Sequence, residues 1–220
     1  MLFLKGQLER VFRAVRSEEG TVTIEFVILF PLLAAWFLGS FIYFDAYRSK
    51  TITAKVAFTM SDLMARRGEM NDADLRDYYE IQKRMMPRRM EKSWMRVSSI
   101  CYRERELAGE TVGEYRLHWS TTFDDFYDAD AGELPNIKKY EDDDEIPVNL
   151  MPMMADGDSI IFTEVYGTWE PIAKQFSGYM GLSELTWAQR ITERPRFTRV
   201  ISYESEGATN ICNAATWEPS

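Results

Sequence analysis

The sequence predicts an α+β protein in which one long N-terminal helix packs on a mainly antiparallel sheet. Residues 21–44 form an apolar run with a single charge, and apolar residues then continue at helical spacing as far as Met64. From Trp94 onward the pattern changes toward the alternation that is typical of strands. The 220 residues are enough for one compact domain and an anchor.

Charge and composition argue against several functional classes. The chain carries 26 basic and 35 acidic residues, which gives a net charge of −9. Nucleic-acid binding depends largely on cations that neutralise phosphates, so we expect no nucleic-acid partner. The single histidine, His118, is expected to be packed or at the surface of a strand, and no nucleophile-elbow, zinc-protease or phosphate-loop motif occurs. We therefore expect no enzyme, no cofactor and no metal.

The apolar run from Thr21 to Phe44 is long enough to span a bilayer. A helix of 24 residues is about 36 Å long, and the hydrocarbon core is about 30 Å thick. Its 14 Leu, Ile, Val and Phe residues contribute about −4 to −8 kcal/mol to insertion, whereas Glu25 costs at most about 3 kcal/mol. The competing interpretation, a cleaved secretory signal, predicts a shorter apolar core and a small-residue cleavage site, and neither is present.

Four basic residues precede the apolar run within a leader of residues 1–20, and they are Lys5, Arg10, Arg13 and Arg16. Positive charges flanking a membrane helix stay in the cytoplasm, so we expect a single-pass protein with a cytoplasmic N-terminus. In a bacterium, residues 45–220 then lie in the periplasm, attached to the inner membrane. This assignment divides the chain into the leader, the membrane helix 21–44, a helical region 45–92 and a sheet domain 93–220.

The junction between leader and helix carries a motif. Gly20 is followed by four uncharged residues, then by Glu25 and Phe26, and then by the apolar run. This arrangement resembles the type IV prepilin signature, in which a membrane-bound prepilin peptidase cuts after the glycine. The resemblance implies a processing site between Gly20 and Thr21 and a mature chain with Glu25 as its fifth residue.

The position of Glu25 has a physical interpretation. A carboxylate in lipid requires a cation or a proton, and cleavage would give Thr21 a free ammonium group. In a stack of parallel helices, Glu25 of one subunit can meet that ammonium on its neighbour at one axial offset only. The alternative is that Glu25 lies at the membrane interface, where the N-terminal end of a helix dipole favours an anion.

Residues 16–40 resemble the opening of TadE-like proteins, which are pseudopilin-like components of tight-adherence (Tad/Flp) pilus assembly and secretion systems. The likeness lies in Glu25-Phe26, the apolar run and Pro31-Leu32-Leu33. Flp-type pilins commonly have Tyr where Phe26 stands. The resemblance implies assembly through helix packing in the lipid bilayer, with Pro31 bending the helix. It implies three partners: other pilin or pseudopilin subunits, a prepilin peptidase and an inner-membrane assembly platform. The alternative is a single-span periplasmic binding module or receptor unrelated to pili.

Helical spacing indicates two helices in residues 45–92. The first continues the membrane helix, with Ile52, Val56, Met60, Leu63 and Met64 on one face and Gly68 as its stop. The second is expected to begin after Asn71 as N-cap and to end at Pro87. Its apolar positions include Leu75, Tyr78, Tyr79, Met85 and Met86.

Alternation predicts five strands in residues 93–220. They are expected at residues 94–102, 115–119, 159–166, 185–191 and 197–203. Gly109 and Gly113 are expected to frame a turn, and Glu104, Glu106 and Glu110 are expected to lie in this turn region. Asp156-Gly157 predicts a turn before a strand, and residues 171–179 predict a short helix. The acidic run 141–145 favours a solvated loop, with a calcium site as the alternative.

Cys101 and Cys212 are candidates for a disulfide, because a translocated domain lies in an oxidising compartment. A bridge across 111 residues would stabilise the fold by about 4–5 kcal/mol in the chain-entropy model. The alternative is two separate thiols, one of them buried.

Overall fold

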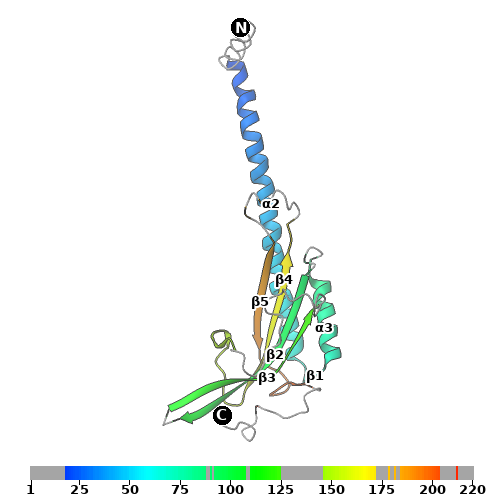
Figure 1. The fold of residues 1–220 in the computed structure, drawn as a ribbon, viewed down its shortest axis with the longest axis vertical. Helices are drawn as coiled ribbons and strands as arrows, with labels where there is room; N and C mark the ends of the chain where they lie inside the picture. The colour runs from blue at the N-terminus through cyan, green and yellow to red at the C-terminus, as the bar shows by residue number, and fades with distance from the viewer. Residues whose placement is uncertain are drawn as a thin grey trace, which may run out of the picture.

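The computed structural model describes residues 18–87, 90, 92–107, 110–124, 146–171, 178, 181, 184–203 and 212. Helix α2 (Glu18–Ala65) forms the long axis, and a four-stranded sheet lies along its C-terminal part (Figure 1). The sheet consists of β2 (Lys92–Leu107), β3 (Glu110–Asp124), β4 (Ser159–Trp169) and β5 (Leu185–Glu193). The remaining elements are β1 (Glu69–Met70), α3 (Asp72–Met85), the 3-10 turn η1 (Val148–Leu150) and β6 (Ser202–Tyr203). The predicted α+β class is confirmed.

Helix α2 is continuous over 48 residues, or about 72 Å, and passes through Pro31. Its N-terminal half stands clear of the sheet, whereas its C-terminal half packs along β4 and β5 (Figure 1). Val56, Met60 and Met64 of the predicted apolar face are buried, which confirms that face. The helix ends at Ala65, three residues before Gly68. There the backbone N–H of Arg196 donates to the Ala65 carbonyl oxygen at 2.8 Å and satisfies one terminal acceptor.

The four strands are antiparallel and lie in the order β3-β2-β4-β5. Because side chains alternate along a strand, Ile161, Val165 and Trp169 of β4 face α2 in the main core, while Ile160 and Phe162 face the other side. The side facing α2 is apolar. The opposite side is mixed, and it carries the polar network described below.

Helix α3 confirms the boundaries predicted for it. Asn71 is the N-cap, and its side-chain oxygen accepts a hydrogen bond from the Asp74 backbone N–H at 2.8 Å. Leu75, Tyr78 and Tyr79 are buried, and the helix ends at Met85, ahead of Pro87.

The β2–β3 hairpin is longer than the sequence predicts. Glu104, Glu106 and Glu110 lie in strands rather than in a turn, and Gly113 lies inside β3. The Tyr102 side chain lies directly over Gly113, so a Cβ at this position would force the Tyr102 ring to shift. The arm extends beyond the pairing with β4, so its strands do not need one apolar face, and the alternation signal is absent.

A β-bulge bends this hairpin away from the body (Figure 1). Ser99 pairs with Trp119 and Ile100 pairs with Leu117, so His118 is the extra residue of β3. The expected strand position of His118 is therefore confirmed, at an irregular point of the ladder.

The last predicted strand is mostly irregular. Only Ser202–Tyr203 is a strand, and it pairs in parallel with β1. Side chains hold the preceding segment instead: Trp119 Nε1 donates to the Ile201 carbonyl oxygen at 2.9 Å, and Ser159 Oγ donates to that of Arg199 at 2.7 Å. Gly68 allows this segment to approach, since a Cβ there would lie 3.1 Å from Thr198 Cγ2.

Several predictions fall largely or wholly outside the described residues. They concern the basic residues of the leader, the acidic run 141–145 and most of the helix expected at 171–179. The turn predicted at Asp156-Gly157 is present, with a left-handed φ of 78° at Gly157.

We expect Asn71→Ala to lower the free energy of unfolding by about 1 kcal/mol, because the Asp74 N–H loses its acceptor. Chemical unfolding of the detergent-solubilised chain, followed by tryptophan fluorescence, measures this change. Asn71→Asp retains a capping oxygen and should stay close to the parent protein. Equal losses for the two variants would show that the cap does not contribute.

Candidate functional site

The candidate assembly site lies on the free half of α2. Gly20 and Thr21 belong to the backbone of this helix, which begins at Glu18. Glu25 and Phe26 follow within the next turn and a half, and both side chains are exposed. The Phe26 and Phe30 rings stack at 5.3 Å one turn apart, next to Pro31. The site is thus a helix surface on which a lone carboxylate is followed by aromatic and aliphatic groups.

The region around this site has the composition of a membrane span. Among the described residues, one helix is long and apolar enough to cross a bilayer, and it is α2 from Val22 onward. Every large apolar side chain from Val22 to Phe41 is exposed. A surface of this kind is stable only against lipid or against other helices.

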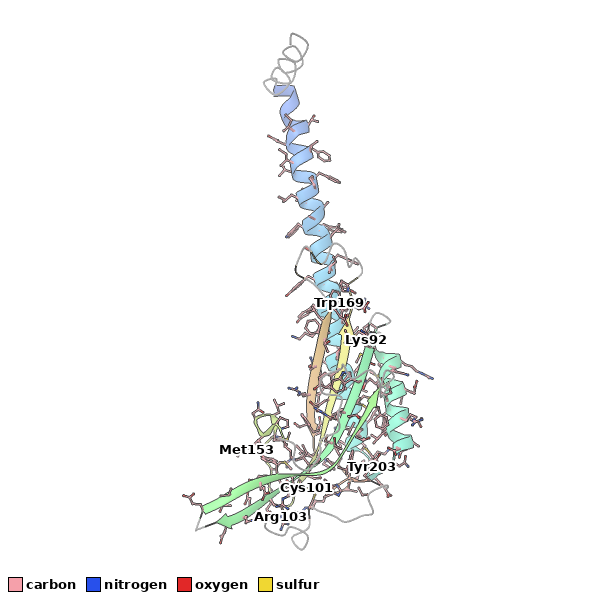
Figure 2. The ribbon with its side chains drawn as sticks, in the orientation of Figure 1. Lys92, Cys101, Arg103, Met153, Trp169 and Tyr203 are labelled. Atoms are coloured by element: carbon pink, nitrogen blue, oxygen red, sulfur yellow. A yellow bond between two sulfur atoms is a disulfide. The ribbon has the colours of Figure 1, made fainter. Side chains whose placement is uncertain are left out.

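The second candidate feature, the disulfide, is present between Cys101 and Cys212, with a Cα–Cα distance of 5.5 Å. Cys101 is the last residue of β2 that pairs with β4, at the point where the hairpin leaves the sheet (Figure 2). Arg103 Nη1 also donates to the Cys212 carbonyl oxygen at 3.3 Å. The bridge therefore fastens Cys212 to the root of the hairpin.

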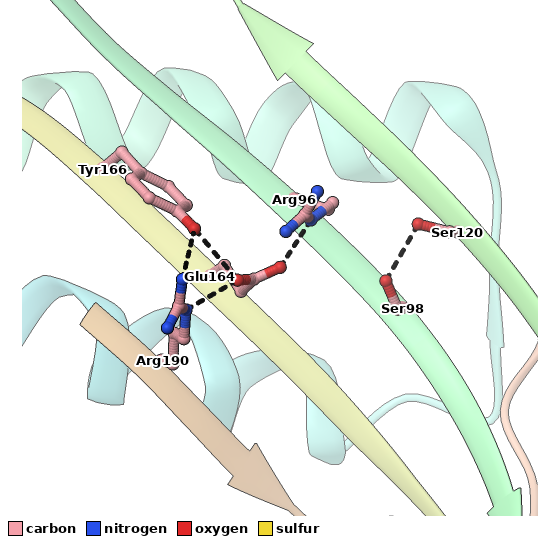
Figure 3. A network of polar contacts seen from close by, with 6 residues as sticks. All are labelled: Arg96, Ser98, Ser120, Glu164, Tyr166 and Arg190. Atoms are coloured by element: carbon pink, nitrogen blue, oxygen red, sulfur yellow. Dashed lines mark hydrogen bonds and ion pairs between the residues drawn. The ribbon is translucent and has the colours of Figure 1, made fainter. Parts of the chain in front are cut away.

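The structure also contains a buried polar network that the sequence did not reveal. Glu164 on β4 is fully buried and lies between Arg96 on β2 and Arg190 on β5, both directly opposite it in the strand register (Figure 3). Arg96 Nε donates to Glu164 Oε2, and Arg190 Nε donates to Oε1 at 3.0 Å. The network lies on the sheet side facing away from α2 (Figure 3).

Tyr166, two residues after Glu164 on β4, also belongs to the network. Its hydroxyl group donates to Glu164 Oε1 at 3.0 Å and accepts from Arg190 Nη2 at 3.4 Å. Its ring stacks on Trp94 with a centroid distance of 3.4 Å. Burial, together with the negative charge of Glu164, raises the pKa of Tyr166, so the hydroxyl group keeps its proton and acts as a donor to the carboxylate.

These contacts fix the register of β2 and β5 relative to β4. A one-residue slip of β2 or β5 would move an arginine to the apolar side facing α2 and leave the Glu164 charge without it. A strand pattern alone cannot reveal this pairing, because it depends on the register between strands 68 residues apart. The one available signal was a glutamate at the same alternation position as Ile160 and Phe162.

The described residues were also compared with the requirements of a metal site. Among the described residues, no group of three or more His, Cys, Asp or Glu side chains is placed to hold a metal ion. Comparison with protein-family models, curated proteins and solved structures finds no significant match to this chain.

We expect Glu164→Gln to destabilise the fold by about 3–5 kcal/mol, because Arg96 is left buried without its opposite charge. Arg190→Gln should cost markedly less, since the Arg190 side chain is 46% exposed and water can replace its contacts. Urea unfolding of the two variants gives the comparison. Similar losses for both variants would contradict the assigned difference in burial.

Proposed function

We propose that this chain is a membrane-anchored minor pseudopilin that acts in assembly of a Tad/Flp type IV-like pilus or a related secretion machinery. It spans the bacterial inner membrane once, with its N-terminus in the cytoplasm and its sheet domain in the periplasm. Its activity is structural: α2 packs against other pilin or pseudopilin helices in the bilayer, while the domain contacts partners outside. The assembly platform and a prepilin peptidase are the further partners.

The observation that supports this proposal most strongly is the division of α2 into two halves. One half packs on the sheet, and the other presents apolar side chains on all sides. A helix that served only as a tether would need neither rigid continuity with the domain nor a carboxylate near its N-terminal end. Continuity matters for a subunit that is moved as a unit, because a force on the domain is then transmitted directly to the membrane helix.

In this proposal Glu25 determines how neighbouring helices align. After cleavage between Gly20 and Thr21, the ammonium group of one subunit neutralises the Glu25 carboxylate of another. Each pair is stable at one stagger only, since any other offset leaves two charges unpaired in lipid. Phe26 and the turn around Pro31 provide the apolar contacts next to this pair.

Glu25→Gln should lower fibre output about 10- to 100-fold, the loss expected for one charge-assisted hydrogen bond of about 1.5–3 kcal/mol. Glu25→Asp keeps the charge and should retain most of the output. Fibres sheared from cells are quantified against the amount of the chain in the membrane. Undiminished output from the Gln variant at equal membrane level would refute the proposed pairing.

Processing gives an independent test. Intact-mass analysis of the membrane form from cells with an active prepilin peptidase should show loss of residues 1–20, and N-terminal sequencing should begin at Thr21. Gly20→Leu should remain full-length, because a large side chain replaces the residue before the cleaved bond. A full-length parent chain in those cells would contradict the processed form.

One observation favours a second candidate, a single-span periplasmic binding module. Met153 is 95% exposed and Phe197 is 77% exposed. The segments that carry them are neighbours, since Arg194 Nη2 donates to the Met153 carbonyl oxygen at 2.7 Å. Met153 lies toward the end of the molecule opposite the N-terminus (Figure 2). The two functions differ in the response to Glu25→Gln, which leaves a binding module unaffected.

A further inference from the structure

The uncovered part of α2 has a well-defined length. Every large apolar side chain from Val22 to Phe41 is exposed, and Ile42 is the first buried one, at 4% exposure. These 20 residues measure about 30 Å along the helix, which equals the thickness of a typical hydrocarbon core. The helix that the domain leaves free is therefore just sufficient to span a bilayer.

The domain begins where this stretch ends, and no linker separates them. Trp169 Nε1, at the end of β4, donates to Asp45 Oδ2 on α2 at 3.0 Å. One turn further along the helix, Lys50 Nζ lies 5.5 Å from the centroid of the Trp187 ring on β5. These contacts fix the end of the sheet beside residues 45–50 (Figure 2). The domain cannot move along the helix, and the helix cannot sink past the domain.

The surface at this junction has the chemistry of a membrane interface. Tyr43, Phe44 and Tyr47 are all more than 60% exposed on α2. Arg48 and Lys50 are exposed next to them. The nearby acid Asp45 is engaged with Trp169. Aromatic rings and cations are the side chains that favour the headgroup layer, where phosphate groups offer negative charge.

Lys92 adds a third cation at the same end of the sheet. It pairs in register with Thr168, the residue before Trp169, and its side chain is about half exposed (Figure 2). It forms an ion pair with Glu184, in which Lys92 Nζ and Glu184 Oε1 are 3.5 Å apart, and both side chains are about half exposed to solvent. Cations of two separate elements, α2 and β2, therefore lie at the end of the domain from which the apolar helix emerges.

We infer that the domain is seated directly on the bilayer, with the surface formed by Tyr43, Tyr47, Arg48, Lys50 and Lys92 bound to lipid phosphate headgroups. This seat places Val22–Phe41 across the hydrocarbon core. Glu25 then lies only three residues, or about 5 Å, inside the opposite boundary. The inference deepens the proposed function, because it sets the depth of the Glu25 carboxylate before assembly, and it rests on the membrane anchor alone.

The depth of Glu25 changes its energetics. The cost of a charge in a membrane helix falls toward the interface, and a glutamate one turn from the boundary can extend its carboxylate into the headgroup layer. In a single subunit the Glu25 carboxylate therefore stays within reach of water and headgroups without a partner. Pairing with a neighbouring ammonium becomes necessary only when the subunit is raised and the carboxylate enters the hydrocarbon.

The test measures the depth of single cysteines in the full-length chain, reconstituted without other proteins into phosphatidylcholine/phosphatidylglycerol vesicles. A small permeant maleimide reacts with thiolate, so it labels only sulfur atoms that water reaches. We expect Ile24→Cys and Tyr47→Cys to be labelled at least about tenfold faster than Leu29→Cys and Trp36→Cys. All four native side chains are exposed, so their replacement leaves the core intact.

Two controls define the scale. The chain without an added cysteine reports the background, because its two cysteines are joined in the disulfide. Phe58→Cys reports a thiol in water, because Phe58 is 56% exposed and lies on the part of α2 that packs on the sheet, away from the membrane. Fast labelling of Phe58→Cys also shows that the maleimide reacts under the conditions used.

Bilayer thickness distinguishes a seated domain from a helix that slides. In lipids with longer acyl chains, Ile24→Cys should lose reactivity while Tyr47→Cys stays fast, because the domain holds that end at the surface. A parallel loss at Tyr47→Cys, or fast labelling of Leu29→Cys in standard lipids, would overturn the inference. Because no other pilus component is present, this result is independent of fibre output, so failure of the seat and failure of the pseudopilin function can be told apart.

Discussion

The apolar surface of α2 must be covered along its whole length, and the described part of the domain covers only the C-terminal half. That half needs one apolar stripe, because the sheet meets it from one side. The other half is apolar all round, which is the surface that lipid or several neighbouring helices accept. A single uninterrupted helix thus has to satisfy two environments. The abrupt change at Ile42, from exposed to buried, marks the boundary between them.

The domain resists distortion through two constraints at different places. In the middle of the sheet, Glu164 is fixed between two arginines, which ties the registers of β2, β4 and β5 to one another. At the root of the hairpin, the Cys101–Cys212 bridge joins chain segments 111 residues apart. The network restricts the folded state to one strand alignment, whereas the bridge removes conformational freedom from the unfolded chain. Together they give α2 a stiff body to pack on.

Much of this architecture follows from the sequence, and the reason is local. The helix face with Val56, Met60 and Met64, and the cap at Asn71, depend on residues within a few turns of one another, so periodicity predicts them. The Arg96–Glu164–Arg190 row depends on register, which alternation alone leaves undetermined. Residues 103–107 and 110–114 of the hairpin arm lacked a strand signal because neither of their faces had to be apolar. The parallel pairing of β1 with β6 spans two residues, too few for any pattern.

In the proposed pseudopilin, the placement of the Glu25 carboxylate links the fold to assembly. Were Glu25 deep in the hydrocarbon, every unassembled subunit would carry the cost of a desolvated charge, and aggregation in the membrane would be indiscriminate. A seat that holds Glu25 near the interface removes that cost for the unassembled subunit. The cost returns when the domain is lifted from the headgroups, and a neighbouring ammonium then offsets it. In this proposal the same rigid helix stabilises the single subunit in the bilayer and makes its pairing conditional on the domain being lifted.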